Sequence, residues 1–527
     1  MVTPNSLDLE TAVGLIAQSI SLLHAQRADD ALHCLDEALR MVPDFPPALV
    51  KRGVVLHALS RHGESIAVYD RCLTQKPDMP HVRALRESAL RAALDDVDLN
   101  LNLNLDSANR PAQAQIWCER GGLLLCLQRD AEALASYRQA LEVDPLHAAA
   151  LNQMGNLLLR MNRQDEALAC YERILAFAPD DVIALFNRGN VWQQNGRYRE
   201  ALSSYDMALA GRPDLPEVLV EQAHCRLALG EFQAGWPLFE ARWDTEQLRG
   251  AKLKTAAPLW RGETVGAAAV LLLWAEQGFG DTLQFVRYLP LVASRVENVV
   301  VRVPVGLRAL IAAMENGHSI HVIGDDEPLA PHDLHCPLMS LPLAFGTDVQ
   351  TIPAAVPYLK APAAVAARWR TELGARRKPR IGLVWAGGQR LLNNPTRDMR
   401  LELLRPLLQH DAEWFSLQKS MSDDDLLTLE TMPPVRCVGD ELANFADTAG
   451  LIEQLDLIVS VDSAVAHLAG ALGKPVWLML RKSGEWRWMQ RRTDSPWYPS
   501  HRIFRQHTHG EWAHVVQEIA QHLRLPA

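Results

Sequence analysis

The chain has 527 residues, too many for a single hydrophobic core, so its length predicts two or three domains. Its 53 lysines and arginines are outnumbered by 63 aspartates and glutamates, and this formal charge of −10 argues against a protein that coats nucleic acid. Hydrophobic residues make up 48% of the sequence, which excludes wholesale disorder.

Three sequence features bear on where the protein works. The longest apolar runs, such as AAAVLLLW (267–274), fall far short of the about 20 residues that a membrane span needs. The first ten residues show no basic segment followed by an apolar one, so no signal peptide is expected. The eight cysteines show no CxxC pair and no zinc-like spacing, which is typical of a reducing compartment. We expect a cytoplasmic protein without a transmembrane segment.

The first part of the chain repeats with a period of 34 residues. Prolines stand at positions 43, 77, 111, 145, 179 and 213, glycines at 53, 121, 155 and 189, and aromatic residues at 69, 137, 171, 205 and 239. The pattern, as in ALNQMGNLLLRMNRQDEALACYERILAFAPD (150–180), resembles the tetratricopeptide repeat (TPR). The glycines let two helices pack closely, the aromatic residue fills the gap to the next repeat, and the proline ends each unit.

About six repeats are expected over 12–215. The unit at 80–113 departs from the pattern, because Leu99 replaces an alanine and LNLNLNL (99–105) replaces the usual second helix. That unit is either distorted or divides the solenoid into two segments. Helices at 216–250 are expected to cap the stack against the next domain.

A solenoid exposes a concave surface that usually binds a protein or a peptide. The residues expected to face this groove are Asn152, Asn156, Phe186, Asn190 and Gln193. Asparagine both donates and accepts hydrogen bonds, so a ladder of asparagines can hold a peptide backbone without reading its sequence. The alternative is that asparagine is only a tolerated polar residue on an exposed helix face.

From residue 251 onward, short apolar runs alternate with helical periodicity, which predicts a parallel sheet. We expect two Rossmann-like lobes at 251–375 and 376–510, a hinge between them at 361–379, and a C-terminal helix (511–527) that crosses back to the first lobe. Two such lobes facing one cleft are the GT-B architecture of glycosyltransferases. The predicted strands are 269–274, 298–303, 319–324, 380–386, 414–419, 435–439, 456–462 and 475–480.

Two strand-to-helix turns carry most of the chemical information. In the first, Gln277, Gly278 and Gly280 form a tight loop after a strand, and Asp281 begins a helix. GFGDTL lacks the third glycine of GxGxxG, so a dinucleotide fingerprint is weakly supported. Asp281 also has a purely structural interpretation as a helix cap.

In the second turn a buried strand ends at Asp462, and Ser463 and Ala464 begin a helix whose amides form an anion site. His467, one turn further on, is expected to face the same cleft. The alternative is a core histidine whose hydrogen bonds are satisfied.

These turns resemble a known family. DSAVAHLAGALGKPVW (462–477) resembles the D-[ST]-x-x-x-H-L-A-x-A-x-G-x-P motif of heptosyltransferase-like family 9 glycosyltransferases. EQGFGDTLQFVRYLP (276–290) resembles their G-D-x-L turn, and SPWYPSHRIFRQ (495–506) fits the end of repeat-fused bacterial members. The resemblance covers nearly all of 265–507.

The resemblance implies roles for the residues of both turns. Asp281 would act as general base on the acceptor hydroxyl, and the first lobe would bind the acceptor. Ser463 and Ala464 would hold the donor diphosphate, Asp462 would meet the sugar, and His467 would lie nearby. A displacement at an anomeric carbon needs both a base and positive potential on the leaving diphosphate.

Cations near the cleft are further candidates for binding the diphosphate. They are Arg397, Lys419 and Arg481, which follow predicted strands or lie in loops, and we favour Lys419 because it closes a predicted strand. Each can also be read as a solvated surface cation. No credible D-x-D metal motif appears in this half, so no metal and no cofactor are expected. The tryptophan-rich stretch 483–499 either closes over the nucleotide or packs against the sheet.

The sequence therefore predicts an N-terminal TPR α-solenoid followed by an α/β region of two Rossmann-like lobes, and the resemblance implies that this region is an inverting GT-B glycosyltransferase, which we expect to be metal-independent. By the same resemblance its substrates would be a nucleotide-sugar and a protein acceptor, flagellin-like, held in the repeat groove. A lipopolysaccharide-type acceptor is the second possibility. The rival functions are a repeat scaffold whose transferase half is inactive and a nicotinamide-dependent oxidoreductase, which the missing third glycine disfavours.

Overall fold

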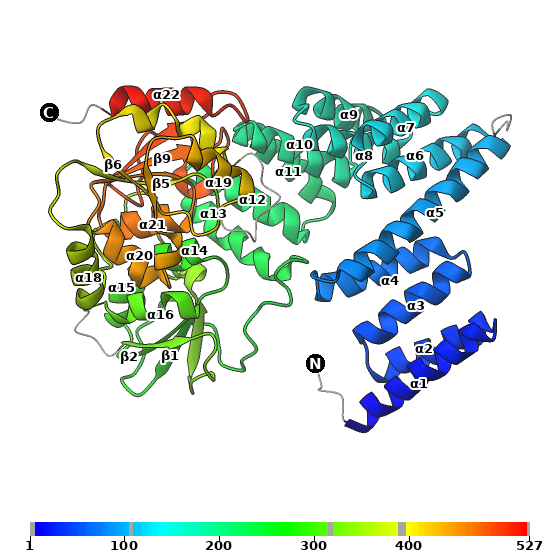
Figure 1. Cartoon of the computed structure of the whole chain (residues 1–527), viewed down its shortest axis with the longest axis horizontal. Helices are drawn as coiled ribbons and strands as arrows, with labels where there is room; N and C mark the ends of the chain where they lie inside the picture. Colours follow the sequence, from blue (N-terminus) through cyan, green and yellow to red (C-terminus); the bar gives the residue numbers. More distant parts are fainter. Residues whose placement is uncertain (1–5, 105–108, 315–319, 388–396, 524–527) are drawn as a thin grey trace. The chain divides into compact units, whose positions relative to one another are not determined.

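A computed structural model describes residues 6–104, 109–314, 320–387 and 397–523 (Figure 1). The chain divides into two compact units, 1–184 and 185–527, and each is described by itself. In both units the described part contains no helix with the length and hydropathy needed to cross a membrane.

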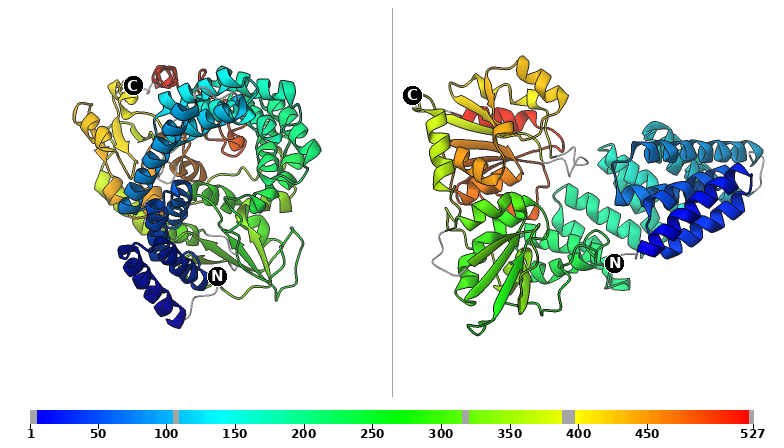
Figure 2. Two further views of the ribbon diagram at one scale, coloured as in Figure 1. Left: turned by 90° about the vertical axis from the view of Figure 1, so that its right-hand side faces the viewer. Right: turned by 60° about the horizontal axis from the view of Figure 1, so that its bottom comes forward.

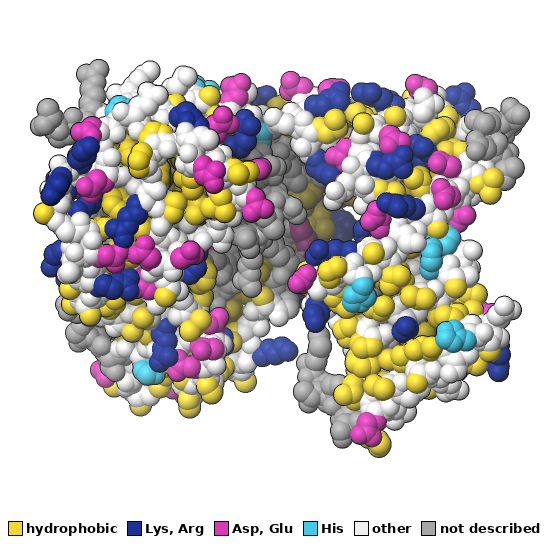
Figure 3. All heavy atoms as spheres, in the orientation of Figure 1, with side chains coloured by type: hydrophobic (Ala, Val, Ile, Leu, Met, Phe, Trp, Pro, Cys, Tyr) yellow, Lys and Arg dark blue, Asp and Glu magenta, His cyan; other side chains and the backbone are white. Residues whose placement is uncertain are grey.

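The first unit consists of helices that pack in sequence order, α1 on α2, α3 on α4, α6 on α7 and α8 on α9. Buried apolar side chains of α1–α5 form a core that runs from Ala12 to Ala89. On the face drawn in Figure 3, hydrophobic side chains gather over α1–α4, and Leu7 and Val13 of α1 are exposed. The helices are α1 (Ser6–His24), α2 (Ala28–Met41), α3 (Pro46–Ala58), α4 (His62–Gln75), α5 (Pro80–Asn104), α6 (Arg110–Cys126), α7 (Asp130–Val143), α8 (Ala148–Arg160) and α9 (Gln164–Phe177).

The periodic glycines and aromatic residues explain the helix pairing. In each of four repeats a tyrosine ring lies on the glycine sixteen residues earlier, so that an added Cβ would come within 2.3–2.7 Å of the ring. The predicted close packing is present, but the tyrosine fills the gap within its own repeat instead of the gap to the next one. The four pairs are Gly53 with Tyr69, Gly121 with Tyr137, Gly155 with Tyr171 and Gly189 with Tyr205.

The unit at 80–113 lacks both members of this pair. Glu87 and Leu103 stand at the positions of the glycine and the tyrosine. Without them the two-helix packing is lost, and the segment forms one helix of 25 residues, α5, in place of two. The expected departure from the repeat pattern is therefore real. Part of the LNLNLNL run, residue 105, lies outside the described residues.

Two adjacent glycines in α6 give a matched test of this packing. Gly121 faces the Tyr137 ring, whereas Gly122 has no other group within 4 Å of an added Cβ. We expect Gly121→Ala to destabilise the protein by about 1–3 kcal/mol, because the buried ring has to move. Gly122→Ala is expected to stabilise it by up to about 1 kcal/mol through helix propensity. Urea unfolding followed by circular dichroism measures both changes, and equal effects of the two substitutions would contradict this packing.

The second unit begins with the last helices of the repeat region. They are α10 (Val182–Gln194, which starts just before the boundary), α11 (Tyr198–Gly211), α12 (Pro216–Ala228), α13 (Phe232–Phe239) and η1 (Glu240–Asp244). These helices pack onto the α/β region that follows. The Trp236 indole donates to the carbonyl of Thr347 at 2.9 Å and meets the Trp486 ring edge to face at 5.3 Å. The Tyr198 hydroxyl donates to the carbonyl of Ser483.

The α/β region contains two parallel sheets (Figure 2, right). The first has the strand order β3-β2-β1-β4, and its strands are β1 (Val270–Trp274), β2 (Asn298–Val303), β3 (Ile320–Gly324) and β4 (Leu334–Pro337). The second has the order β10-β9-β8-β5-β6-β7, and its strands are β5 (Arg380–Val384), β6 (Glu413–Ser416), β7 (Val435–Cys437), β8 (Leu457–Val461), β9 (Val476–Leu480) and β10 (His501–Arg505). All eight predicted strands are present, and β4 and β10 are additional.

Helices follow most of the strands. They are α14 (Phe279–Phe285), α15 (Leu289–Ala293), α16 (Val305–Ala312), α17 (Leu341–Ala344), α18 (Ala363–Leu373), α19 (Asp423–Glu430), α20 (Phe445–Ile452), α21 (Ala464–Ala471) and α22 (Ala513–His522). α18 occupies the stretch predicted as a hinge. α22 packs against β10 and the short turns η5 (Leu401–Leu404) and η6 (Leu407–Gln409) of the second lobe. A helical repeat region followed by two parallel-sheet lobes confirms the predicted fold class and is consistent with a GT-B-like domain.

Candidate functional site

The two predicted strand-to-helix turns, one from each sheet, meet. α14 follows β1, α21 follows β8, and the two helices pack against each other (Figure 1). An added Cβ at Gly280 would lie 2.9 Å from the His467 ring and 3.6 Å from the Cα atom of Ala464. Because the carboxyl ends of parallel strands usually carry the ligands of α/β proteins, the contact brings both halves of the predicted site together.

Asp281 is held from two sides. Its Oδ2 accepts the backbone N–H of Gly278, the N-cap residue of α14, at 3.0 Å, so the structural interpretation as a capping residue is correct. Its Oδ1 accepts from the Arg487 guanidinium at 2.5 Å. Burial raises the pKa of Asp281, although the charge of Arg487 opposes this rise. A buried carboxylate with a raised pKa is suited to accept a proton.

Asp462 and His467 lie across the contact, at the start of α21. Burial, followed by the nearby charge of Glu485, raises the pKa of Asp462 to about 6. The Nε2 atom of His467 is 3.8 Å from Asp462 Oδ1, and its Nδ1 is 2.9 Å from the Tyr498 hydroxyl. Burial lowers the pKa of His467 well below its usual value, so the ring is neutral, and it stacks on Trp488 at 5.2 Å. The histidine is thus buried and also faces the site.

Ser463 and Ala464 form the N-terminus of α21. The Ser463 hydroxyl accepts from the Ala466 amide at 3.4 Å and lies 2.9 Å from the Ser460 hydroxyl. Ala464 is the first residue of the helix. In the other turn Gln277 is exposed and directly precedes Gly278.

The three predicted cations differ in their surroundings. Arg397 is largely buried and near enough to Asp462 for its charge to oppose the raised pKa of that carboxyl, and its Nη2 has no hydrogen-bond partner within the described part of the chain. Arg481 follows β9 and, like Arg487, lowers the pKa of Glu485 against the effect of burial. The Lys419 ammonium donates to the backbone carbonyl of Leu442 at 2.7 Å.

Two charged residues of the site, Arg487 and Glu485, were not predicted from the sequence. Both lie in the tryptophan-rich stretch, which drew attention only for its aromatic residues, and of the two interpretations its packing is observed. Trp486, Trp488 and Trp497 are buried. Arg487, in the turn η8 (Trp486–Trp488), reaches α14 of the other lobe. No spacing rule in the sequence marks an arginine between two tryptophans as a partner of Asp281.

A second buried ion pair lies directly before the first turn. The fully buried Glu276 accepts from Arg242 of η1 at 2.7 Å, and Arg242 also donates to Glu240 at 2.7 Å. Burial raises the pKa of Glu276 to about 7. The Arg242 guanidinium, which is shared with Glu240, opposes this rise without cancelling it. The last part of the repeat region thus contacts the loop that leads to Asp281.

The predicted groove residues are partly occupied within the protein. The Asn156 side-chain oxygen accepts from the Tyr171 hydroxyl at 2.6 Å. In the second unit the Tyr205 hydroxyl lies 2.7 Å from the oxygen of Asn190 and 2.6 Å from that of Gln193. Phe186 is 6.1 Å from the Tyr205 ring, and Asn152 is partly buried on α8. The Tyr171 hydroxyl therefore orients Asn156, and the single proton of the Tyr205 hydroxyl is donated to either Asn190 or Gln193.

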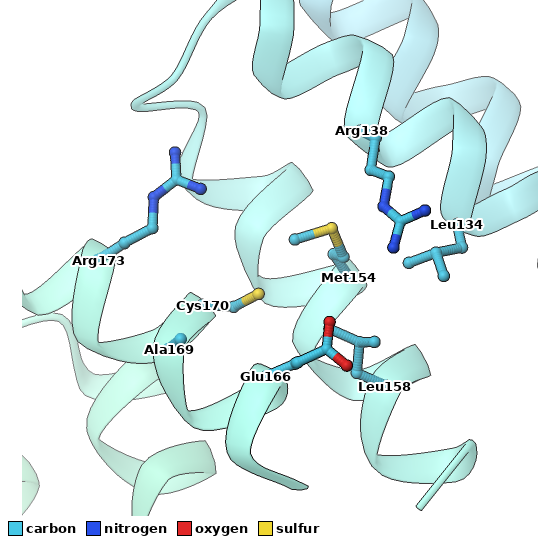
Figure 4. A pocket seen from close by; sticks show the side chains of 8 residues that line it. All are labelled: Leu134, Arg138, Met154, Leu158, Glu166, Ala169, Cys170 and Arg173. Carbon is cyan, nitrogen blue, oxygen red and sulfur yellow. The ribbon is translucent and has the colours of Figure 1, made fainter. Parts of the chain in front are cut away.

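A cavity of about 200 Å³ lies between α7, α8 and α9 (Figure 4). Met154 and Leu158 line it, two residues on from Asn152 and Asn156, which places them about 200° round the helix. The cavity is therefore on the other face of α8 from the predicted asparagine ladder. The remaining lining residues are Leu134, Arg138, Glu166, Ala169, Cys170 and Arg173.

Comparison with known protein families supports both halves of the chain. Tetratricopeptide repeat profiles match residues 16–80, 152–216 and 114–145. The profile of glycosyltransferase family 9 (heptosyltransferase) matches residues 442–521, which include Asp462, His467 and Arg487. TPR repeats are therefore followed by a stretch, 442–521, that matches glycosyltransferase family 9, as the resemblance predicted.

Individual relatives are more distant. Protein FlbA of Caulobacter vibrioides (strain ATCC 19089 / CIP 103742 / CB 15) is 24% identical over 325 residues, which are 56% of this chain and 53% of FlbA, about half of its length. The TPR protein YrrB, described as having an unusual peptide-binding site, is 21% identical over 40% of this chain and 91% of its own, with a TM-score of 0.21. A tetratricopeptide repeat protein from Parabacteroides merdae ATCC 43184 is 18% identical over 46% of this chain and 97% of its own, with a TM-score of 0.26.

Proposed function

We propose that this protein transfers a sugar from a nucleotide-sugar donor to a hydroxyl group of a protein acceptor. One observation carries the proposal: two largely buried carboxylates, Asp281 and Asp462, belong to turns that meet from the two lobes. The family 9 match supports glycosyl transfer, and the TPR repeats support a protein acceptor, flagellin-like in our proposal.

The proposed mechanism is a single inverting displacement. Asp281 accepts the proton of the acceptor hydroxyl, whose oxygen bonds to the anomeric carbon of the sugar. The bond from that carbon to the diphosphate breaks, and the nucleoside diphosphate leaves with the electron pair. A buried base of raised pKa fits the first part of this step, because proton transfer is most efficient when the pKa is near the working pH.

On the donor side we propose that the start of α21, Ser463 and Ala464, binds the diphosphate and that Asp462 and His467 meet the sugar. Arg397 and Arg481 supply the positive charge, because the buried Nη2 of the first has no partner among the described residues and the second follows β9. Lys419 stays a weaker candidate, since its ammonium is already bound to backbone carbonyls. In this proposal the cations replace a metal, and no cofactor is needed.

The domain limits and the location of the protein belong to the same proposal. Residues 251–375 would carry the acceptor side and 376–510 the donor side. All eight cysteines are free, which supports a reducing, cytoplasmic compartment.

A thermal-shift panel of UDP, GDP, CMP, ADP and their common sugar conjugates tests the proposal. A ligand at 100 times its dissociation constant stabilises its domain by about 2.7 kcal/mol. We expect one nucleotide to stabilise the wild type and Asp440→Ala, a control at an exposed position of the same lobe, but not Asp462→Ala. A wild type that responds to no nucleotide would contradict the proposal and favour the scaffold function.

A further inference from the structure

Arg487 donates three hydrogen bonds to three different side chains. Its Nε bonds Gln284 of α14 at 2.8 Å, its Nη1 bonds Glu485 at 2.5 Å, and its Nη2 bonds Asp281 at 2.5 Å. The side chain is 8% exposed, so this charge is largely removed from water and pairs with two carboxylates and one amide oxygen. Gln284 and Asp281 belong to the first lobe and Arg487 to the second, so the guanidinium joins the lobes at the proposed base.

The last helices of the repeat region determine where Arg487 lies. α12 packs against η8. Just after this turn, the backbone N–H of Gln490 donates to the carbonyl of Ala228, at the end of α12, at 2.9 Å. Trp486 packs edge to face on Trp236 of α13. These contacts fix both ends of the turn that carries the guanidinium.

The charges around Asp281 make a counter-charge necessary. Glu485 and Glu276 both repel an ionised Asp281, and burial disfavours it further. On the other side, Arg487 faces Asp462 and the Tyr498 hydroxyl in addition to Asp281 and Glu485. Arg487 lowers the pKa of Asp281 and so opposes the effects of burial and of Glu485.

We propose that Arg487 is a positioning residue of this transferase: it fixes Oδ1 of Asp281 and supplies the charge that keeps this carboxylate able to accept a proton. The inference rests on the proposed function for the role of Asp281 as a base. A carboxylate has about four lone-pair sites, and the bonds from Arg487 and the Gly278 amide leave two of them for the acceptor hydroxyl.

The direct test measures the pKa of Asp281 without any substrate. Carbon-13 NMR of aspartate-labelled protein follows the carboxyl, with Asp281→Asn to assign the signal. We expect Arg487→Gln to raise this pKa by about 1–3 pH units and Arg487→Lys to leave it near the wild-type value. Glu485→Gln should lower it, because a repelling carboxylate is removed. An Asp281 pKa that is unchanged in Arg487→Gln or Glu485→Gln overturns the proposal.

A matched control separates this role from simple joining of the lobes. Arg287 is also a buried guanidinium, and it bonds the carbonyl of Trp497 at 2.6 Å and the Tyr358 hydroxyl at 3.0 Å without contacting Asp281. Arg287→Gln should lower stability but leave the pKa of Asp281 in place. An equal shift of the Asp281 pKa in Arg487→Gln and in Arg287→Gln would mean that it arises from a general loosening of the contact between the lobes. That result would overturn the proposal. If Arg487→Gln fails to fold, the pKa of Asp281 in Arg487→Lys and in Glu485→Gln still tests the proposal.

The second readout is the pH profile of nucleoside diphosphate release from whichever donor stabilises the wild type. Loss of Arg487 keeps Asp281 protonated to higher pH, so the acid limb of kcat/KM should move upward by as much as the measured pKa, with Arg487→Lys restoring it. A shifted pKa with an unmoved acid limb overturns the role of Arg487 in the reaction. If the wild type transfers no sugar but the pKa shift is present, the proposed function fails and the contact between Arg487 and Asp281 stands.

Discussion

Replacing Asp281 with asparagine is expected to lower the rate of sugar transfer by about 10²–10⁴-fold, the usual contribution of a general base. The amide is close in shape to the carboxyl, so its oxygen can still accept the Gly278 amide at the start of α14. What is lost is the ability to take a proton. Donor affinity should be unchanged, because the proposed donor residues belong to the other turn. Transfer with labelled sugar and the thermal shift with the donor nucleotide measure the two effects separately.

Asp447 gives a matched control for this substitution. It occupies the same third position of a helix, α20, accepts the amide of the N-cap residue Asn444 at 3.3 Å, and pairs with one arginine, Arg368, at 3.1 Å. Asp447→Asn should therefore cost about 1–2 kcal/mol of stability and leave transfer intact. A transfer rate near that of the wild type in Asp281→Asn would remove this residue from the role of base.

Replacing Trp236 with alanine is expected to lower the unfolding free energy by about 3–5 kcal/mol. The indole is 2% exposed, donates a hydrogen bond to Thr347, and contacts the rings of Phe232, Phe239 and Trp486. The substitution leaves a cavity between the repeat helices and both lobes. Since Trp486 adjoins Arg487, transfer should fall as well, although Trp236 is remote from the proposed chemistry.

Trp192 is the control for this prediction. It is partly buried within the repeat region, where Arg197 lies over its ring at 4.1 Å. Trp192→Ala should cost about 1–2 kcal/mol and leave transfer unaffected. Urea unfolding and the transfer assay test both variants, and equal losses from the two tryptophans would show that Trp236 does not couple the repeats to the transferase.

The predictable parts of the fold are those with a local signal. Strands such as β1 and β8 are buried on both faces and read as continuous apolar runs, so the sequence predicts them. β4 (LHCP) and β10 (HRIFR) were not predicted, because they are edge strands that contain a proline or charged residues. They become strands by pairing with β1 and β9, and such distant partners leave no local pattern.

The candidate site divides in the same way. Asp281 and Asp462 could be found because each follows an apolar strand at a turn with a recognisable motif. Lys419 was favoured by the same rule, but its strand ends three residues earlier, at Ser416, and its ammonium donates to the carbonyl of Leu442. Arg487 depends on a contact between the two lobes, more than 200 residues apart in sequence, and only a three-dimensional arrangement reveals it.

The hydrogen bonds between the tyrosines and the groove residues could not be predicted from the sequence either. Periodicity placed Asn156 and Asn190 on the groove side, but the same periodicity puts a tyrosine fifteen residues later within reach of each. The positions of these asparagines follow from the periodicity of a single helix, whereas their tyrosine partners belong to the next helix. The 34-residue period therefore fixes both the groove side chain and the hydroxyl that orients it.

The boundary between the compact units falls inside the repeats, before α11, and this restricts how the protein can be divided or recombined. A chain shortened to begin near residue 250 would lose α12 and α13 and expose the aromatic side chains of Trp486 and Trp497 that they now cover. Exchange of the earlier repeats for others would have to keep residues 182–250, from the start of α10 onward, with the α/β region.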